Sequence, residues 1–390
     1  MLADFLEPFW EWLFDKMGTG GLLVAGSVPF LLILLVVLLI AGVVAVIRKS
    51  VAAAKKRKQE KLAQRAMDLW QDGEYGEAME HYFKLEKMRP LTSEEKYDMA
   101  LICADGAQEG WPYEDKRHDE DYWLKQAEKE GSVEAMQYAA HKELIHANST
   151  LEAAKAVRRL HIVQQKGSSD AQKIMDNYKA RMVEAKIDPR MIKLVMGDAE
   201  GMTIFAQALF DKGSMDAEAM GWLLLAADYG YAEAQYQAGC RLIDGDGVKQ
   251  DVKEGVRLLK EAAGKKHALA CAMLGVVYAG GIVDNKPNLY TARDWFEKSL
   301  EIKENAAVMY ELGMLYDRMF EERAKQLNMD PNAVATDRYC GEYYRKKMKW
   351  LRKAEKLGNQ DAKKALDEFY SGMENGDLLR KLGDLLEDKE

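Results

Sequence analysis

The stretch "AMLGVVYAGGIVDNKPNLYTARDWFEKS", residues 272–299, decides the fold class. Small and apolar residues recur at helical spacing on both sides of a glycine-rich turn, which is typical of two short helices. Gly275 lies within the first helical segment, where the missing side chain lets another helix approach closely. The stretch therefore predicts two antiparallel helices. Such a pair cannot bury its apolar faces alone and must stack on neighbouring pairs.

The same pattern recurs along the chain at nearly constant spacing. Glycine returns after 36 and then 38 residues, at Gly239, Gly275 and Gly313. A large apolar residue keeps its own phase, with intervals of 36 and 37 residues, at Trp222, Leu258 and Trp295, and Trp350 occupies this position in a later copy. We expect the glycines to be close helix contacts and the tryptophans to be core residues.

These copies resemble Sel-1-like repeats, a subclass of the tetratricopeptide (TPR) superfamily. Their motif is A-x-x-x-L-G-x-x-Y, a glycine-rich turn and A-x-x-W-x-x-x-A-A-x-x-G, and residues 272–299 match it best. Near the other end, "LWQDGEYGEAMEHYFKLEKMRP" resembles the TPR pattern at Gly73, Tyr75, Ala78, Tyr82 and Pro90. The resemblance covers roughly 60–390 and is loosest between 140 and 200. It implies an all-α fold, with a right-handed superhelical α-solenoid of helix pairs over 66–390.

One copy departs from the period. Trp295 and Trp350 are 55 residues apart, about 18 more than one repeat. The extra residues, an insertion around 317–346, are predicted to lengthen both helices of that copy and their connection. Insertions in repeat arrays often lie on the binding face, and Tyr and Arg favour interfaces. The candidate partner-binding residues are Arg338, Tyr339, Tyr343, Tyr344 and Arg345. The alternative is a solvated helix extension.

Residues 21–47 are 27 residues without a charge, which is enough for a helix that spans a membrane. We therefore predict a transmembrane helix over 21–47 and a basic juxtamembrane helix or linker over 48–65. The basic residues that follow the span are Arg48, Lys49, Lys55, Lys56, Arg57 and Lys58. Only Lys16 precedes it, so the positive-inside rule predicts an N-terminus outside and a repeat domain in the cytoplasm.

Residues 1–20 have apolar side chains at helical spacing, with Asp4, Glu11 and Asp15 elsewhere on the helical wheel. Trp10 and Trp12 add aromatic rings of the kind that favour a membrane interface. We expect an extracytoplasmic amphipathic helix on the outer face of the membrane. The alternative is that this segment binds a partner on that side.

The sequence offers little catalytic chemistry. It lacks the Walker A, G-x-G-x-x-G and G-x-S-x-G motifs. His141 and His146 are five residues apart, too far round a helix to share one metal ion. The four cysteines are scattered, as buried apolar residues would be. No catalytic, cofactor-binding or metal-ligating residue is predicted, no cofactor is expected, and we expect no enzyme.

The acidic stretch "LIDGDGVKQD", residues 242–251, is interpreted as a turn within a repeat. An EF-hand loop that began at Asp244 would need an acid or amide at Val248 and a glycine at Lys249. Gly245 and Gly247 are instead predicted to adopt left-handed backbone turns, and Asp251 to cap the next helix. A second irregular stretch, residues 105–121, is predicted to be a surface loop, and the alternative is that it contacts a peptide.

The net charge is −8, and acidic and basic residues are mixed along the chain. This pattern predicts no nucleic-acid partner. The leading hypothesis is a single-pass protein of the plasma (inner) membrane, a scaffold or adaptor whose cytoplasmic array recruits protein or peptide partners. By analogy the layout suggests a bacterial inner membrane. One alternative is a signal-transducing or transport-accessory subunit that uses the outer helix and span. A ligand-binding or enzymatic repeat protein is the third hypothesis, although no small-molecule cofactor is expected.

Overall fold

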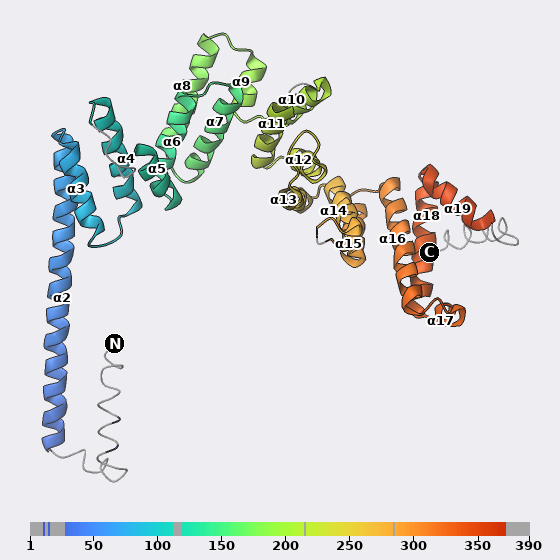
Figure 1. Ribbon diagram of the computed structural model, residues 1–390, viewed down its shortest axis with the longest axis horizontal. Helices are drawn as coiled ribbons and strands as arrows, with labels where there is room; N and C mark the ends of the chain where they lie inside the picture. Colours follow the sequence, from blue (N-terminus) through green and yellow to red (C-terminus); the bar gives the residue numbers. More distant parts are fainter. Residues whose placement is uncertain are drawn as a thin grey trace. The chain divides into compact units, whose positions relative to one another are not determined.

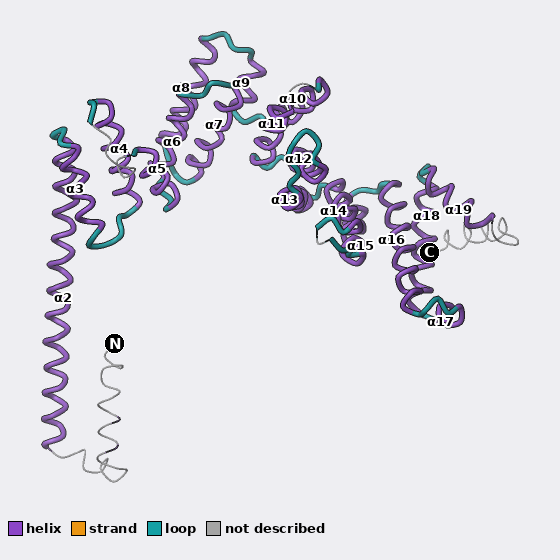
Figure 2. Tube along the Cα trace, in the orientation of Figure 1, coloured by secondary structure: helices purple, strands orange, loops and turns teal. Residues whose placement is uncertain are grey.

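The computed structural model describes Glu11, Asp15 and the ranges 28–111, 119–213, 216–283 and 285–371, with side chains omitted for 28–35 and 331–332. Within these ranges the chain consists of helices joined by turns and loops, and no strand is present (Figure 2). The predicted all-α class is confirmed. Apart from Glu11 and Asp15, the predicted helix over residues 1–20 lies outside the described residues.

The chain divides into two compact units, Met1–Ala139 and Ala140–Glu390. Helices of the first unit are labelled in Figure 1, and α6 crosses the boundary between the units. They are α2 (Val28–Gln71), α3 (Tyr75–Glu86), α4 (Ser93–Gln108), α5 (Glu120–Lys129) and α6 (Val133–Ile145).

The first unit is built around one long helix. α2 runs without a break from the apolar stretch through the basic stretch to Gln71. Its last turns pack against α3, and Ala66 and Leu69 are buried in a core with Met79 and Tyr82. Residues 48–65 are thus part of this helix, and the end of α2 serves as the first helix of the TPR-like pair.

From Val36 onward, the apolar part of α2 exposes its side chains to solvent. Among the described residues, one helical segment, Val36–Gln71, is long and apolar enough to cross a membrane. Its apolar side chains are exposed, including Leu39 at 61% and Ile47 at 56%. A contiguous exposed apolar surface of this kind is typical of a segment that contacts a partner or lipid.

The second unit contains helices that pack in order along the chain. They are α7 (Thr150–Gln165), α8 (Asp170–Glu184), α9 (Pro189–Val195), α10 (Ala199–Lys212), α11 (Asp216–Asp228), α12 (Ala232–Asp244), α13 (Val252–Gly264), α14 (Ala268–Gly280), α15 (Leu289–Ile302), α16 (Ala306–Gln326), α17 (Pro331–Thr336), α18 (Arg338–Lys356) and α19 (Gln360–Ser371). From α10 onward they form the pairs α10/α11, α12/α13, α14/α15 and α16/α18, and each pair packs on the next. The predicted array of helix pairs is confirmed. Its right-handed superhelix stays a prediction.

The repeated glycines lie where the two helices of a pair meet. A Cβ atom added at Gly275 would lie 2.6 Å from the ring of Phe296 on α15. At Gly239 it would lie 2.9 Å from Leu259, and at Gly313 it would lie 3.0 Å from Leu351. Any side chain at these positions would push the two helices apart.

The repeated tryptophans differ in their burial. Trp222 is fully buried and meets Phe205 edge-on, with ring centroids 5.7 Å apart. Trp295 and Trp350 are only half-buried and pack at the margins of their cores. Similar positions in the sequence therefore bury the ring to different depths.

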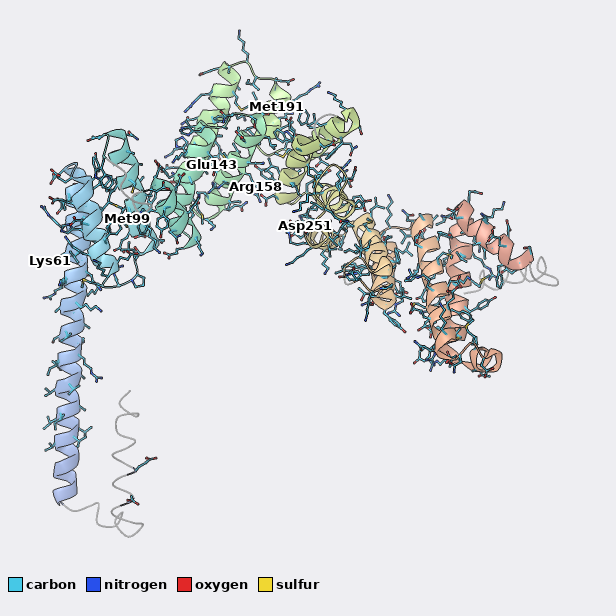
Figure 3. The ribbon with its side chains drawn as sticks, in the orientation of Figure 1. Lys61, Met99, Glu143, Arg158, Met191 and Asp251 are labelled. Atoms are coloured by element: carbon cyan, nitrogen blue, oxygen red, sulfur yellow. The ribbon has the colours of Figure 1, made fainter. Side chains whose placement is uncertain are left out.

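The acidic stretch is a turn, as predicted. Gly245 ends α12 with a φ of +74°, and Gly247 has a φ of +70°. The Asp251 carboxylate, labelled in Figure 3, accepts a hydrogen bond of 3.0 Å from the backbone N–H of Glu254 and caps α13. Its carboxylate therefore serves the helix end.

The insertion lengthens both helices of its copy and their connection, as predicted. The long copy has helices of 21 residues (α16) and 19 residues (α18), against 13 in α12, and the short helix α17 lies between them. In the first unit, α4 continues to Gln108, and residues 112–118 lie outside the described ranges. Trp111 packs against the first core, where a Cβ atom added at Gly76 would lie 3.5 Å from its ring and one added at Gly106 would lie 2.9 Å from it. At Trp111 the surface-loop prediction is wrong, because the small residues leave room for its ring.

Candidate functional site

The predicted partner-binding residues meet a neighbouring repeat. The Tyr343 hydroxyl lies 3.3 Å from that of Tyr290 on α15. The ring of Tyr343 lies 6.3 Å from that of Tyr339. We call this region the tyrosine–arginine surface, which comprises Tyr290, Arg293, Arg323, Tyr339 and Tyr343.

Helix starts position the two outer tyrosines. Asn288 caps α15 by accepting a 3.0 Å hydrogen bond from the Thr291 N–H, and Tyr290 follows in the first turn. Asp337 caps α18 by accepting a 2.9 Å bond from the Cys340 N–H, and Tyr339 follows in the same way. A side-chain cap stabilises the first turn of a helix. The two caps therefore fix the backbone from which each tyrosine ring projects.

Two buried tyrosines, Tyr316 and Tyr343, lie beneath the exposed rings of this surface. Tyr316 of α16 is fully buried and its hydroxyl donates a 3.0 Å hydrogen bond to Glu297. Its ring lies 6.2 Å from that of Tyr343, which is only 8% exposed. Burial is the main cause that raises the pKa of both phenols. Both hydroxyls therefore remain protonated at neutral pH.

Acidic partners hold the two arginines. Arg323 lies 5.5 Å from the centre of the Tyr339 ring and forms a 2.8 Å ion pair with Asp337. The hydrogen bonds from Arg323 lower the pKa of the Asp337 carboxyl to about 2. Arg293 lies 5.7 Å from the centre of the Tyr290 ring and pairs with Asp294 at 2.6 Å. Guanidinium groups fixed in this way lose little further freedom when a partner binds.

The exposed rims of the tyrosine–arginine surface are available to a partner. Tyr290 is 60% exposed and Tyr339 is 53% exposed. Aromatic rings beside arginines are the residue types that dominate protein interfaces. Arg338 and Arg345 are exposed on α18 as well. Tyr344 points elsewhere, since its ring packs 5.9 Å from that of Phe369 on α19.

Sequence reasoning missed Tyr290 and Arg293 because they belong to the preceding repeat. The only signal is the stretch "NLYTARDW", which places both residues in the first turns of the second helix of that repeat. The basic residues Arg48 and Lys49, and likewise Lys55 to Lys58, are exposed along α2. Lys61, farther along the same helix, is labelled in Figure 3.

Other reactive groups in the described ranges are held in unreactive settings. All four cysteines are free thiols. Burial raises the pKa of Cys103 to about 12 and that of Cys240 to about 11, which keeps both thiols protonated. The described residues contain no cluster of three or more His, Cys, Asp or Glu side chains that could hold a metal ion.

Comparison with known proteins gives a narrow sequence match. No model of a known protein family matches the chain. Chitin synthase regulatory factor 3 of Schizosaccharomyces pombe is 30% identical to it over 96 residues. This match covers 24% of the chain and 10% of that protein, so the chain spans a small part of its relative.

Three solved structures are similar to the chain over most of its length. A Sel1 repeat protein from Oxalobacter formigenes is 17% identical, covers 76% of this chain and 99% of its own, and has a TM-score of 0.31. A protective antigen of uropathogenic Escherichia coli strains, which displays an SLR fold, is 20% identical, with coverage of 80% and 75% and a TM-score of 0.30. Yeast Tom70 is 12% identical, with coverage of 78% and 77% and a TM-score of 0.23.

Because these TM-scores are low, the fold assignment rests on the chain's own repeated helix pairs. Each of the pairs α12/α13, α14/α15 and α16/α18 has a glycine where its two helices meet. The described part of the chain contains an all-α array of packed helix pairs, and α2, the helix at its start, has one apolar stretch long enough to cross a membrane.

Proposed function

We propose that the chain is a membrane-anchored scaffold whose repeat array binds protein or peptide partners. The observation that carries this proposal is the continuity of α2. One helix contains an exposed apolar stretch and, at its other end, residues buried in the first repeat core. An anchor joined in this way holds the array beside the bilayer and raises the local concentration of a bound partner.

The tyrosine–arginine surface is the proposed contact region. Its exposed rings rest on buried ones, and its arginines are already oriented by acids. Preorganisation of this kind lowers the entropic cost of binding. We assign the chain no catalytic role and no cofactor.

The charge flanks support the proposed orientation. Six exposed basic residues follow the apolar stretch, and these are Arg48, Lys49, Lys55, Lys56, Arg57 and Lys58. Short flanks rich in Lys and Arg remain on the cytoplasmic side. The array then faces the inner surface of the membrane, and we propose a bacterial inner membrane as its location.

Two measurements test the anchor and its direction. Alkaline carbonate extraction of membranes leaves an integral protein in the pellet, and we expect the full chain there. A reporter fused after residue 390 that is active only outside the cytoplasm is expected to stay silent. Release by carbonate would contradict the anchor, and an active reporter would reverse the orientation.

A third measurement tests recruitment. Partners are cross-linked in membranes that contain the full chain or its Arg338→Ala, Tyr339→Ala double variant. Both side chains are exposed, so the substitution spares the core. We expect the variant to lose partners that a matched double variant of exposed residues on α5, Tyr122→Ala and Lys125→Ala, retains. Equal recovery from both variants would remove the tyrosine–arginine surface as the binding site.

The continuity of α2 also favours a second function, in which the span transmits a signal to the array. Each residue inserted after Lys55 rotates the first repeat by about 100° about the helix axis. One inserted alanine should then disrupt transmission. Seven, which complete nearly two turns, should restore the phase. If one and seven alanines act alike on partner binding, the phase of α2 carries no signal.

A further inference from the structure

Three successive interfaces between repeats are equivalent but are filled differently. In each, the first turn of a second helix faces the loop or insertion of the next repeat. At the first interface, Asp216 of α11 lies against Gly247, where an added Cβ would be 3.2 Å from its side chain. At the third, the insertion contacts α15 through Tyr343, whose hydroxyl lies 3.3 Å from that of Tyr290.

The middle interface is open. There the structure has a hollow of about 540 Å³ between α13 and the loop that follows α14. Its apolar lining is Val252 and Val256 of α13 and Ile282 and Val283 of the loop. We call it the α13 hollow.

The loop residues of the α13 hollow are unusual for this chain. Gly245 and Gly281 both end the first helix of their repeat in a left-handed conformation, which aligns the two loops. The residues after Gly245 are Asp246 and Gly247, whereas those after Gly281 are Ile282 and Val283. These branched side chains are 40% and 38% exposed. Neighbouring apolar side chains left open to water in a turn mark a contact surface.

Among the residues that the structure describes, the charged ones that line the hollow are all basic. They are Lys253, Arg257 and Lys260. Arg257 is already paired with Glu254 at 2.6 Å and with Glu261. Lys253 and Lys260 are exposed and seven residues apart, so they lie on one face of α13 and flank the apolar lining. Lys260 also lies 5.8 Å from the ring centre of Tyr278.

We propose that the α13 hollow is a second docking site, and that it takes an acidic amphipathic peptide segment of a partner. Aliphatic side chains of the segment cover Ile282 and Val283, and its carboxylates pair with Lys253 and Lys260. The charge of the rim selects the acidic segment over a neutral or basic one. This proposal rests on the proposed function only in that the array binds protein segments.

The test uses the full chain in phosphatidylcholine nanodiscs and two labelled helical peptides, followed by fluorescence anisotropy. One peptide carries leucines along one face with glutamates beside them, and its twin carries lysines in place of the glutamates. We expect the glutamate peptide to bind and the lysine twin to bind far more weakly. In the Lys253→Glu, Lys260→Glu variant the glutamate peptide should bind about tenfold more weakly and the lysine twin should gain binding.

A loop exchange tests the apolar contact. Ile282→Asp with Val283→Gly installs the residues of the preceding repeat and should weaken the glutamate peptide by about tenfold, since two aliphatic contacts are lost. The matched controls are Ile204→Asp, which changes an isolated exposed isoleucine on α10, and Lys179→Glu on α8. Both should leave the affinity unchanged.

The gain of binding by the lysine twin protects the test against misfolding, because a variant that fails to fold gains nothing. Equal binding of the two peptides, or an unchanged affinity after the loop exchange, would overturn the α13 hollow as a docking site. Those results would leave the proposed function intact if the Arg338→Ala, Tyr339→Ala variant still lost its partners.

Discussion

Gly275→Ala tests whether the repeated glycines are close contacts. The new Cβ atom would lie 2.6 Å from two ring atoms of Phe296, which is 1% exposed and has no room to move. Overpacking of a core costs about 1–3 kcal/mol, and so close a contact belongs near the upper end. Replacing glycine by alanine within a helix returns about 1 kcal/mol. The expected net loss is about 2 kcal/mol.

Gly341→Ala in α18 is the control. It makes the same chemical change in a helix, but no atom lies within 4 Å of the added Cβ. The control should therefore gain up to about 1 kcal/mol from helix propensity alone. The two substitutions should differ by about 3 kcal/mol, and space alone accounts for most of this difference.

Urea unfolding of the full chain in mild detergent, followed by far-ultraviolet circular dichroism, measures both variants. Phe296→Leu should rescue Gly275→Ala, since the smaller side chain leaves room for the Cβ atom. The double variant should then be less destabilised than the sum of its single substitutions. If Gly275→Ala is as stable as the unchanged chain, or if Phe296→Leu adds its full cost, the contact is not the reason for the glycine.

Three further predictions follow from burial and charge. Trp222→Ala should cost about 3–5 kcal/mol and Trp350→Ala distinctly less, because only the first ring is fully buried, and equal urea midpoints would contradict this. The pKa of Asp337 is depressed to about 2, so its carboxylate stabilises the α16–α18 contact above about pH 4 and that contribution is lost as the pH falls towards 2. Titration followed by NMR should give the low value, and Arg323→Met should raise it. Cys103, with its pKa raised to about 12, should react with iodoacetamide near neutral pH only after unfolding, and rapid labelling of the folded chain would refute its burial.

The helix pairs could be predicted from the sequence because their determinants are local. The spacing of Gly239, Gly275 and Gly313 reports where two helices touch, and each contact joins residues within one repeat. The turn at Gly245 and the cap at Asp251 are also local, since their conformations depend on the next few residues. Such features need no knowledge of the rest of the fold.

The tyrosine–arginine surface was only partly predictable because it depends on helix lengths. The partnership of Tyr290 with Tyr343 spans 53 residues and arises only when both helices of the long copy are in place. Tyr344 could not be told apart from Tyr343 in the sequence either. The two are adjacent residues of the same type, yet Tyr344 packs against α19. The residue types predicted that a contact surface exists. Which residues belong to it depends on how the helices pack in three dimensions.

The structure also changes how the insertion should be probed. Deletion of residues 317–346 would remove Met319, Cys340 and Tyr343, which are buried. Loss of partners after that deletion would report unfolding as readily as loss of a surface. Substitutions at exposed Arg338 and Tyr339 separate the two effects.

The most direct test of the membrane-anchored scaffold is photo-cross-linking from position 339 in intact cells, followed by separation of membrane and soluble fractions. The proposed function predicts a specific cross-linked partner that sediments with the membranes. In cells that express a chain without residues 21–47, that partner should move to the soluble fraction and remain cross-linked. A partner that stays with the membranes in both cases, or the absence of any specific cross-link from position 339, would contradict recruitment by this array.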